Sequence, residues 1–205
     1  MLLYVIVDAA ICEPVATGVA AAKAGAHFIQ LRDFKSHDAE YVATARAIIA
    51  GAGDANVRLI VSERPHLVGR IGAYGVHIGE TYRDIQTARE EIGEGPILGV
   101  SQFSPEFIAE LLGEDFPVDY LSVGPVWSTV SKVDAGAAIG VAEAVKRADA
   151  NPYVTALIGG ITAGNIGELK AALAPNTRAM AVVLGEVCRA ADPGAAVANL
   201  LTALA

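Results

Sequence analysis

The sequence has little positive charge. Its 205 residues include 15 Lys or Arg against 23 Asp or Glu, which gives a formal net charge of -8 and a sequence pI of about 4.9. Such a chain repels phosphate backbones and anionic lipid surfaces, so we expect neither nucleic acid nor a membrane as a partner. Any anion that it binds must be held by a local cluster of cations and backbone amides.

Cysteine is also scarce, and long apolar runs are absent. Cys12 and Cys188 lie far apart in the sequence, and neither belongs to a CxxC motif or to a Cys/His cluster that could bind zinc. We therefore expect two free, buried thiols in a cytoplasmic protein. No apolar run approaches the roughly 20 residues that a membrane-spanning helix needs. The apolar start of the chain contains Asp8 and no basic residue before it, which indicates a strand rather than a targeting segment.

The signatures of several enzyme classes are missing as well. There is no nucleophile elbow and no Ser/His/Asp spacing. A dinucleotide-binding GxGxxG should directly follow the first strand, where this sequence has DAAICEP instead. No low-complexity tract, charge block or Pro/Ser-rich spacer marks a linker, which predicts one domain over residues 1–205.

Eight short apolar runs alternate with eight segments of helical spacing. The runs are LLYVIVD, HFIQL, VRLIV, YGVHI, PILGV, DYLSVG, YVTALIG and AMAVVL, and the helical segments span about 14–25, 37–50, 65–72, 83–92, 105–112, 138–149, 163–173 and 193–204. Apolar runs without polar alternation are typical of strands buried on both faces of a parallel sheet. This order predicts an α/β fold, a single (β/α)8 TIM barrel, with an open doubly wound sheet as the alternative.

In a TIM barrel the active site lies at the carboxyl ends of the strands. Polar residues follow several of the predicted strands there: Gln30, Arg32, Lys35, Ser62, Glu63, Ser101, Thr129, Ser131 and Lys132. Arg32 and Lys132 would give the barrel mouth two cations for a ligand with several negative oxygens. Alternatively, each pairs with a neighbouring acid such as Asp33 or Asp134.

The GGIT segment after the seventh predicted strand indicates a phosphate site. Gly159 and Gly160 let the backbone approach a ligand, and amides at the start of the next helix would bind the phosphate, although a purely steric tight turn is the alternative. The sequence does not fix whether the side chain of His77 points into the barrel or towards the helices. We interpret His77 as a structural residue rather than a base. We expect Asp8 to be a hydrogen-bonded carboxylate at the mouth.

Several of these motifs, in this order, resemble a known family. The segments QLRDFK, GVHIGE, ILGVS, DYLSVGPVWSTVSKVDAG and IGGIT resemble thiamin phosphate synthase and its relative thiazole tautomerase, over nearly the whole chain. The resemblance implies a transferase of thiamin biosynthesis. It would join two small phosphorylated substrates, hydroxymethylpyrimidine diphosphate and thiazole phosphate, with release of diphosphate and with Mg²⁺ as cofactor.

The resemblance also implies roles for individual residues. Arg32, Lys132 and Ser101 would be catalytic; the substrate-binding positions would be Gln30, Arg32, Lys35, Ser62, Ser101, Thr129, Ser131, Lys132, Gly159, Gly160, Val183 and Leu184. Thr129 through Ser131 and Gly160 would hold the thiazole phosphate, and Lys132 would neutralise the diphosphate.

At several positions this sequence departs from the family pattern. Phe34 takes the place of the lysine in QxRxK, with Lys35 one residue late, and Leu184 takes the place of a phosphate-binding serine in strand 8. Ser62 and Glu63 replace an Asn-Asp pair, and Tyr82 replaces the second magnesium aspartate. The implied magnesium ligands are therefore Glu63 with Glu80 or Asp84 as a second carboxylate, and the Mg²⁺ site is the part of the pattern most changed.

These departures keep two alternatives open. One is a family paralogue that binds phosphorylated thiamin-related ligands without synthase activity. The other is a thiazole tautomerase-like isomerase, for which the family implies a histidine where this sequence has Pro125. A homo-oligomer is possible, because barrels of this size often associate.

Overall fold

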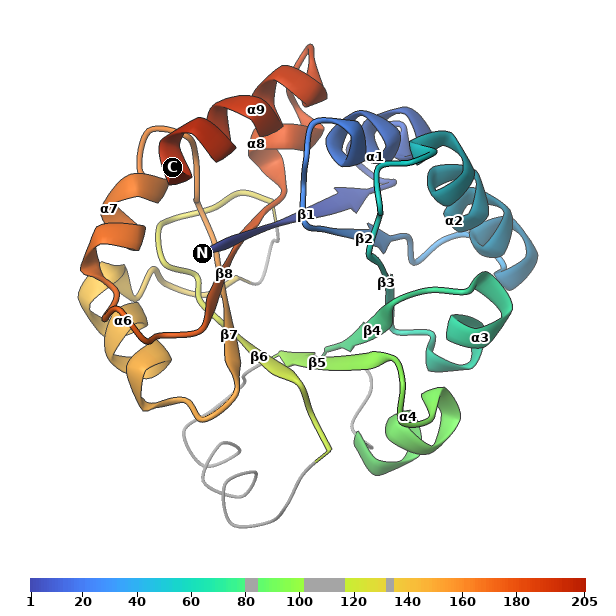
Figure 1. Cartoon of the computed structure of the whole chain (residues 1–205), viewed down its shortest axis with the longest axis horizontal. Coiled ribbons are helices and arrows are strands. Elements are labelled where there is room, and N and C mark those ends of the chain that lie inside the picture. The colour runs from blue at the N-terminus through green and yellow to red at the C-terminus, as the bar shows by residue number, and fades with distance from the viewer. Residues whose placement is uncertain (80–84, 102–116, 132–134) are drawn as a thin grey trace.

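A computed structural model describes residues 1–79, 85–101, 117–131 and 135–205. Within these ranges, eight parallel strands pair in sequence order and close into a barrel. Figure 1 shows the ring of strands in a view along the barrel axis. The strands are β1 (Leu2–Asp8), β2 (Phe28–Arg32), β3 (Leu59–Ser62), β4 (Gly75–Ile78), β5 (Ile97–Ser101), β6 (Tyr120–Val123), β7 (Val154–Ile158) and β8 (Ala179–Val183).

Helices surround the barrel. They are α1 (Pro14–Lys23), α2 (Asp38–Ala52), the 3-10 turn η1 (Pro65–Leu67), α3 (Val68–Ile71), α4 (Ile85–Ile92), α6 (Gly140–Ala150), α7 (Ile166–Ala172), α8 (Gly185–Cys188) and α9 (Pro193–Leu204). None of the helices in the described ranges is long and apolar enough to cross a membrane.

Closure of the barrel confirms the TIM-barrel prediction over the open sheet. The first strand pairs with the last, from Leu2 opposite Met180 to Val5 opposite Val183. Strand boundaries agree with the predicted runs to within about two residues. The eight runs lack polar alternation because both faces of each strand are covered, one by helices and the other by the barrel interior.

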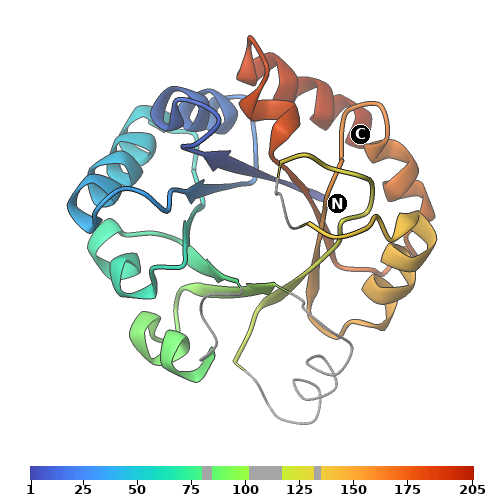
Figure 2. The ribbon, with the colours of Figure 1, turned by 180° about the vertical axis from the view of Figure 1, so that it is seen from behind.

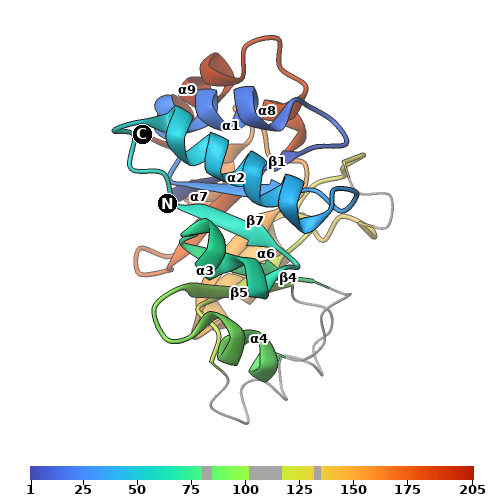
Figure 3. The ribbon, with the colours of Figure 1, turned by 90° about the vertical axis from the view of Figure 1, so that its right-hand side faces the viewer.

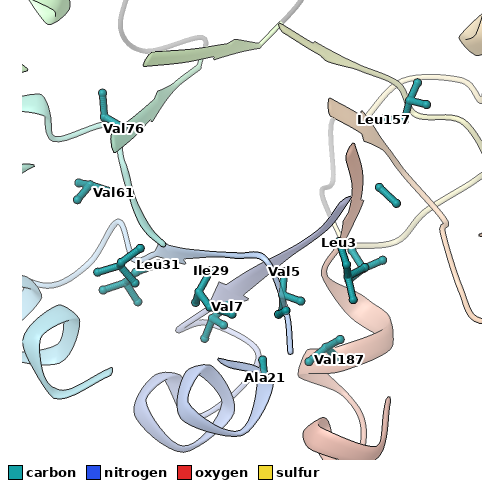
Figure 4. Close-up of a cluster of buried hydrophobic side chains, with 14 of the residues drawn as sticks. Leu3, Val5, Val7, Ala21, Ile29, Leu31, Val61, Val76, Leu157 and Val187 are labelled. Atoms are coloured by element: carbon teal, nitrogen blue, oxygen red, sulfur yellow. The ribbon is translucent and has the colours of Figure 1, made fainter. Parts of the chain in front are cut away.

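Two apolar clusters form the core, one on each side of the strands. Figure 4 shows the outer cluster, in which Val5 and Val7 of β1 and Ile29 and Leu31 of β2 point towards the surrounding helices. The inner cluster fills the barrel: Tyr4, Ile6, Phe28, Ile60, Tyr120, Ala156, Met180 and Val182. The period of two in each strand therefore separates a structural face from a face that looks into the barrel.

A glycine makes room for the largest inward side chain. A Cβ at Gly99 would lie 1.9 Å from Cζ of Tyr120, so β5 can pass the buried Tyr120 ring only because it has no side chain at this position. The phenol of Tyr120 can then reach the centre of the barrel, where the polar groups of the site lie.

The helices differ from the prediction in three places. The segment expected at 65–72 is divided into η1 and α3, and α7 begins at Ile166 rather than at 163. The four-residue α8 was not predicted, since a segment this short carries no readable helical period. The helix expected at 105–112 lies outside the described residues.

The carboxyl ends of the strands form one end of the barrel. In the side view of Figure 3, the loop that follows β6 lies at this end, and both chain termini lie at the other. Figure 2, from behind, shows the same loop crossing the barrel end beside the start of α8. This end is where a TIM barrel holds its active site.

Candidate active site

A cavity of about 580 Å³ opens at the carboxyl ends of the strands. The predicted site residues that line it are Gln30, Arg32, Ser101, Thr129, Ser131, Gly159, Gly160, Val183 and Leu184. Lys35, Ser62 and Glu63 are not among the lining residues. Lys132, Glu80, Tyr82 and Asp84 lie outside the described residues, so their predicted roles stay predictions.

Arg32 enters the cavity held by a carboxylate. Its guanidinium forms an ion pair with Asp8 at the end of the neighbouring strand, and the Asp8 side chain is buried while that of Arg32 is 27% exposed. This confirms Asp8 as a hydrogen-bonded carboxylate at the mouth and gives Arg32 a different acid from the suggested Asp33. The Asp33 carboxylate instead accepts hydrogen bonds from the backbone amides of Lys35 and Ser36.

Phe34, at the family's lysine position, covers the guanidinium of Arg32. The ring centroid lies 4.7 Å from Cζ of Arg32, and 56% of the Phe34 surface is exposed. Lys35 is exposed and lies outside the cavity lining. Here Arg32 therefore has an aromatic neighbour in place of a second cation.

A continuous hydrogen-bond network forms the cavity floor and runs across several strands. The five contacts are Gln30 Nε2 to Ser62 Oγ at 2.7 Å, Tyr4 OH to Gln30 Oε1 at 2.8 Å, Tyr4 OH to Tyr120 OH at 3.0 Å, Tyr120 OH to His77 Nδ1 at 3.0 Å and His77 Nε2 to Ser101 Oγ at 3.1 Å. Ser62 is buried, and within the described ranges its hydroxyl reaches the cavity lining through Gln30. His77 lines the cavity with both ring nitrogens hydrogen-bonded to protein groups, and its interpretation as a structural residue rather than a base stays a prediction.

Counting protons along the network determines its direction. Because the Tyr4 hydroxyl donates to Gln30, the proton between the two tyrosines belongs to Tyr120. His77 must then donate from Nδ1 to the Tyr120 oxygen, and in the tautomer that carries its proton only on Nδ1 it accepts at Nε2 from the Ser101 hydroxyl. The Ser101 oxygen is left to accept a hydrogen bond from a ligand in the cavity.

The two inward tyrosines stay protonated. Burial raises the pKa of Tyr4 well above its ordinary value, and the nearby Tyr120 raises it further. Burial likewise raises the pKa of Tyr120. Both phenols therefore remain hydrogen-bond donors throughout the physiological pH range.

The far side of the cavity is built from the loops after β6, β7 and β8. Arg189 donates a hydrogen bond from Nη1 to Ser131 Oγ at 3.1 Å, and the Ser131 amide donates to Thr129 Oγ1 at 3.2 Å. All three residues line the cavity. A guanidinium beside two hydroxyls offers an anion several donors at once.

The GGIT loop packs against Trp127 and Ser128 of the loop after β6. Gly160 has φ 65°, and a Cβ there would lie 2.7 Å from the carbonyl oxygen of Ser128. The loop after β7 can thus pack against the loop after β6 only with glycine at this position.

The backbone amides that follow Gly160 do not belong to the first turn of a helix, whereas the sequence led us to expect that they would. The Thr162 amide donates to Asn165 Oδ1 at 2.8 Å, and the Ala163 amide donates to Glu186 Oε1 at 3.4 Å. Two turn amides thus have protein partners, and α7 begins further on. Any phosphate here would be held by the loop and its neighbouring side chains rather than by the end of α7.

The described residues by themselves do not fit a magnesium ion. Across residues 1–79, 85–101, 117–131 and 135–205 there is no group of three or more His, Cys, Asp or Glu that could hold a metal. Glu63 lies just after β3, with Oε1 so close to Gly79 that an added Cβ would be 2.6 Å away. It contributes one carboxylate, and Mg²⁺ needs several oxygen ligands in near-octahedral geometry.

Sequence reasoning missed several residues of the site. Tyr4 and Tyr120 were assigned to apolar strands, and Arg189 was not considered because α8 was not predicted. A signal existed for the tyrosines: Tyr4 and Ile6 alternate with Val5 and Val7, which separates the inward from the outward face. No comparable signal existed for Arg189.

Comparison with known proteins agrees with this arrangement. A family model described as thiamine monophosphate synthase matches residues 3–185. The chain is 34% identical over 186 residues to a thiamine-phosphate synthase of Xanthobacter autotrophicus, covering 90% of this chain and 85% of that protein. It is 33% identical over 191 residues to one of Methanospirillum hungatei, covering 91% and 89%.

Solved structures support the same relationship. The thiamine phosphate pyrophosphorylase of Pyrococcus furiosus superposes with a TM-score of 0.84 at 25% identity, over 99% of this chain and 95% of that chain. A 3-hexulose-6-phosphate synthase, at 16% identity and a TM-score of 0.67 over all of both chains, shares the fold. The matches over most of its length, together with the barrel and its cavity, show that the chain belongs to the thiamine monophosphate synthase family.

Proposed function

We propose that this protein is a thiamin phosphate synthase. The thiazole nitrogen of thiazole phosphate would attack the methylene carbon of hydroxymethylpyrimidine diphosphate. The bond from this carbon to the diphosphate oxygen breaks first and diphosphate leaves with the electron pair, after which the thiazole nitrogen forms the new C–N bond with the resulting pyrimidine methylene cation. The observation that carries the proposal is a cavity with a cation on each side, Arg32 and Arg189, above a polar floor.

The side of the cavity formed by β2, β4 and β5 suits the pyrimidine diphosphate. The Ser101 oxygen, positioned through His77 by Tyr120, offers a fixed hydrogen-bond acceptor to a polar ring. Arg32 has an ion pair with Asp8 on one side, which holds its guanidinium in place and leaves further N–H groups for diphosphate oxygens. A cation already held in position stabilises the charge that develops on the leaving group.

The side formed by the loops after β6, β7 and β8 suits the thiazole phosphate. Thr129 and Ser131 supply hydroxyls, Gly160 lets the backbone approach, and Arg189 supplies a charge. Arg189 offers a cation close to Leu184, the position at which the family serine is missing. Binding both substrates in one cavity keeps the thiazole nitrogen near the methylene carbon, so that the nitrogen captures the pyrimidine cation before water does.

Mg²⁺ remains an expectation of the resemblance. When bound, it would neutralise charge on the diphosphate. Glu63 is the one described residue expected to contact it, and the second ligands, Glu80 or Asp84, are not described. The steps above are therefore assigned to the side chains of this chain alone.

The proposal is tested by incubating the folded protein with both phosphorylated precursors over a range of Mg²⁺ concentrations. Thiamin phosphate and diphosphate should form in equal amounts. An Arg32→Ala variant should lose most of the rate, and Arg70→Ala, which removes an exposed arginine away from the cavity lining, should not.

Two other results would each reject the synthase. Binding of either precursor by calorimetry, without turnover at any Mg²⁺ concentration, would identify a binding paralogue. Exchange of substrate protons in the thiazole precursor alone, without joining, would identify an isomerase.

A further inference from the structure

The fold brings together the two cysteines that the sequence keeps apart. Cys12 and Cys188 are 176 residues apart in the chain, yet their sulfur atoms lie 3.1 Å apart. Cys12 lies in the loop after β1 and Cys188 is the last residue of α8, which follows β8. Because β1 and β8 are the strands that close the barrel, these two loops are neighbours.

Backbone contacts hold both thiols in this position. Cys12 Sγ lies 3.4 Å from the carbonyl oxygen of Asp8, and Cys188 Sγ lies 3.3 Å from that of Ile6, so each sulfur has a backbone acceptor beside it as well as the other sulfur. A disulfide needs an S–S distance of about 2.05 Å, so the two sulfurs need to approach by only about 1 Å. We propose that Cys12 and Cys188 form a redox-active pair that an oxidant such as a peroxide converts to an intramolecular disulfide.

The two thiols have different chemical roles in this step. Cys188 is buried as expected, but Cys12 is partly exposed because it lies in a loop, so an oxidant reaches Cys12 first. The hydrogen bond with Cys188 lowers the pKa of Cys12 to about 7, and the interaction with Cys12 together with burial raises the pKa of Cys188. Cys12 is thus the nucleophile and Cys188 the resolving thiol.

The reaction balances with a peroxide as oxidant. The Cys12 thiolate attacks one peroxide oxygen, the O–O bond breaks, and Cys12 becomes a sulfenic acid while the departing hydroxide takes up the proton that the Cys12 thiol had released and leaves as water. Cys188 then attacks the Cys12 sulfur, the S–O bond breaks, and a second water leaves with the Cys188 proton. Two thiols are oxidised by two electrons, and the peroxide is reduced to two waters.

The pair lies between the two sides of the cavity. Cys188 directly precedes Arg189, and Cys12 contacts the backbone of Asp8, which holds Arg32. A new covalent bond here pulls α8 and the loop after β1 together and moves both cations. This effect on the site rests on the proposed function, whereas formation of the disulfide does not.

The disulfide is tested by exposing the reduced full-length protein to hydrogen peroxide, blocking free thiols with iodoacetamide, and mapping peptides by mass spectrometry. The expected product is a monomer that contains a Cys12–Cys188 linked peptide, and dithiothreitol should return both thiols. Alkylation of both cysteines after treatment, a disulfide between two chains, or conversion of Cys12 to sulfinic acid would overturn the proposal.

Two single variants separate the roles of the thiols. In Cys188→Ser, Cys12 should stop at the sulfenic acid, which dimedone traps; in Cys12→Ser, Cys188 should remain reduced. The reverse pattern would contradict the assignment of nucleophile and resolving thiol. Oxidation of the wild-type protein should raise KM for thiazole phosphate severalfold, and reduction should reverse this change. The same treatment should leave KM unchanged in Cys12→Ser. An unchanged KM in a protein with the mapped disulfide would reject that effect alone.

Discussion

Arg189 Nη1 lies 3.1 Å from Ser131 Oγ, so a residue that follows α8 is hydrogen-bonded to the loop after β6 across the cavity mouth. The same arginine reaches over the backbone of Gly185, where an added Cβ would be 2.2 Å from Nη1. A single guanidinium thus joins two of the loops that we assign to the thiazole phosphate.

Replacing Arg189 should weaken phosphate binding more than it slows the chemical step. A charge-assisted hydrogen bond contributes about 1.5–3 kcal/mol, and Arg189 is exposed, so we expect Arg189→Ala to raise KM for thiazole phosphate by about tenfold with little change in kcat. Arg70→Ala is the matched control. Steady-state kinetics with the thiazole substrate varied will measure the effect, and an unchanged KM would remove Arg189 from the site.

Tyr120 and Tyr41 are both buried, but they allow an effect on the cavity to be separated from an effect on stability. Tyr120→Phe removes the hydroxyl that joins His77 to Tyr4, and Tyr41→Phe removes one that donates to Leu31 O at 2.6 Å and accepts from the Ser62 amide at 2.9 Å. Both variants should lose roughly 1–3 kcal/mol in urea unfolding, because each removes two hydrogen bonds of a buried hydroxyl. Only Tyr120 borders the cavity, so only Tyr120→Phe should alter the kinetics of the pyrimidine substrate. Equal kinetic effects in both variants would argue against this distinction.

The contribution of the Arg32–Asp8 ion pair to the free energy of unfolding can be measured. Arg32→Ala leaves the buried Asp8 carboxylate unpaired, and since Arg32 is partly exposed we expect a loss of roughly 1–3 kcal/mol in the free energy of unfolding, less than a fully buried pair would lose. Adding Asp8→Asn should recover much of this stability, because the introduced amide carries no charge and its oxygen still accepts from the backbone N–H of Ala10. The double variant should stay inactive, because it still lacks Arg32. A double variant less stable than Arg32→Ala would show that Asp8 stabilises the fold independently of Arg32.

Gly160 combines an unusual backbone angle with a close contact. Gly160→Ala should destabilise the protein by more than about 1 kcal/mol and raise KM for thiazole phosphate, since the residue has φ 65° and its Cβ would lie 2.7 Å from Ser128 O. Gly72→Ala provides the comparison, with φ 74° in the left-handed region and nothing within 4 Å of an added Cβ. Thermal unfolding of both variants isolates the contact, and similar losses would mean that the backbone angle alone is responsible.

The reactivity of Cys12 should depend on pH. The hydrogen bond with Cys188 lowers its pKa to about 7; Thr17 also lowers it, whereas burial and the Asp8 carboxylate raise it. The thiolate fraction grows as the pH rises through the pKa, so the rate of alkylation by iodoacetamide should increase between about pH 6 and pH 8 with a midpoint at about 7.

Cys188→Ala provides the control for that midpoint. It removes the hydrogen-bond partner, so the midpoint for Cys12 should move up towards the ordinary thiol value of about 8.5. A midpoint that stays at the same pH in this variant would exclude Cys188 as the cause.

The fold could be predicted from the sequence because its eight apolar runs and the segments between them repeat a single unit. The sequence also predicted that polar residues near the ends of strands 2, 5 and 6 gather at the mouth, where all parallel strands end, and Arg32, Ser101 and Thr129 do line the cavity whereas Lys35 does not. The partner of Arg32 could not be identified, because Asp8 is adjacent to it only through the register of β1 and β2.

The cysteine pair could not be predicted for a similar reason. Local spacing says nothing about two residues 176 apart, and they become neighbours only once β8 is known to pair with β1. A barrel prediction does imply that pairing, so the loops after the first and last strands can be compared directly in other sequences of this fold.

Pairing of the first strand with the last also constrains the order of events during synthesis. β1 emerges early but has one unpaired edge until Ala179–Val183 has been made, and exposed strand edges invite pairing with other chains. Contacts of such large sequence separation form late and slow folding. Because Cys12 meets Cys188 only in the completed ring, cross-linking of the two thiols in nascent or refolding chains would report when the barrel closes.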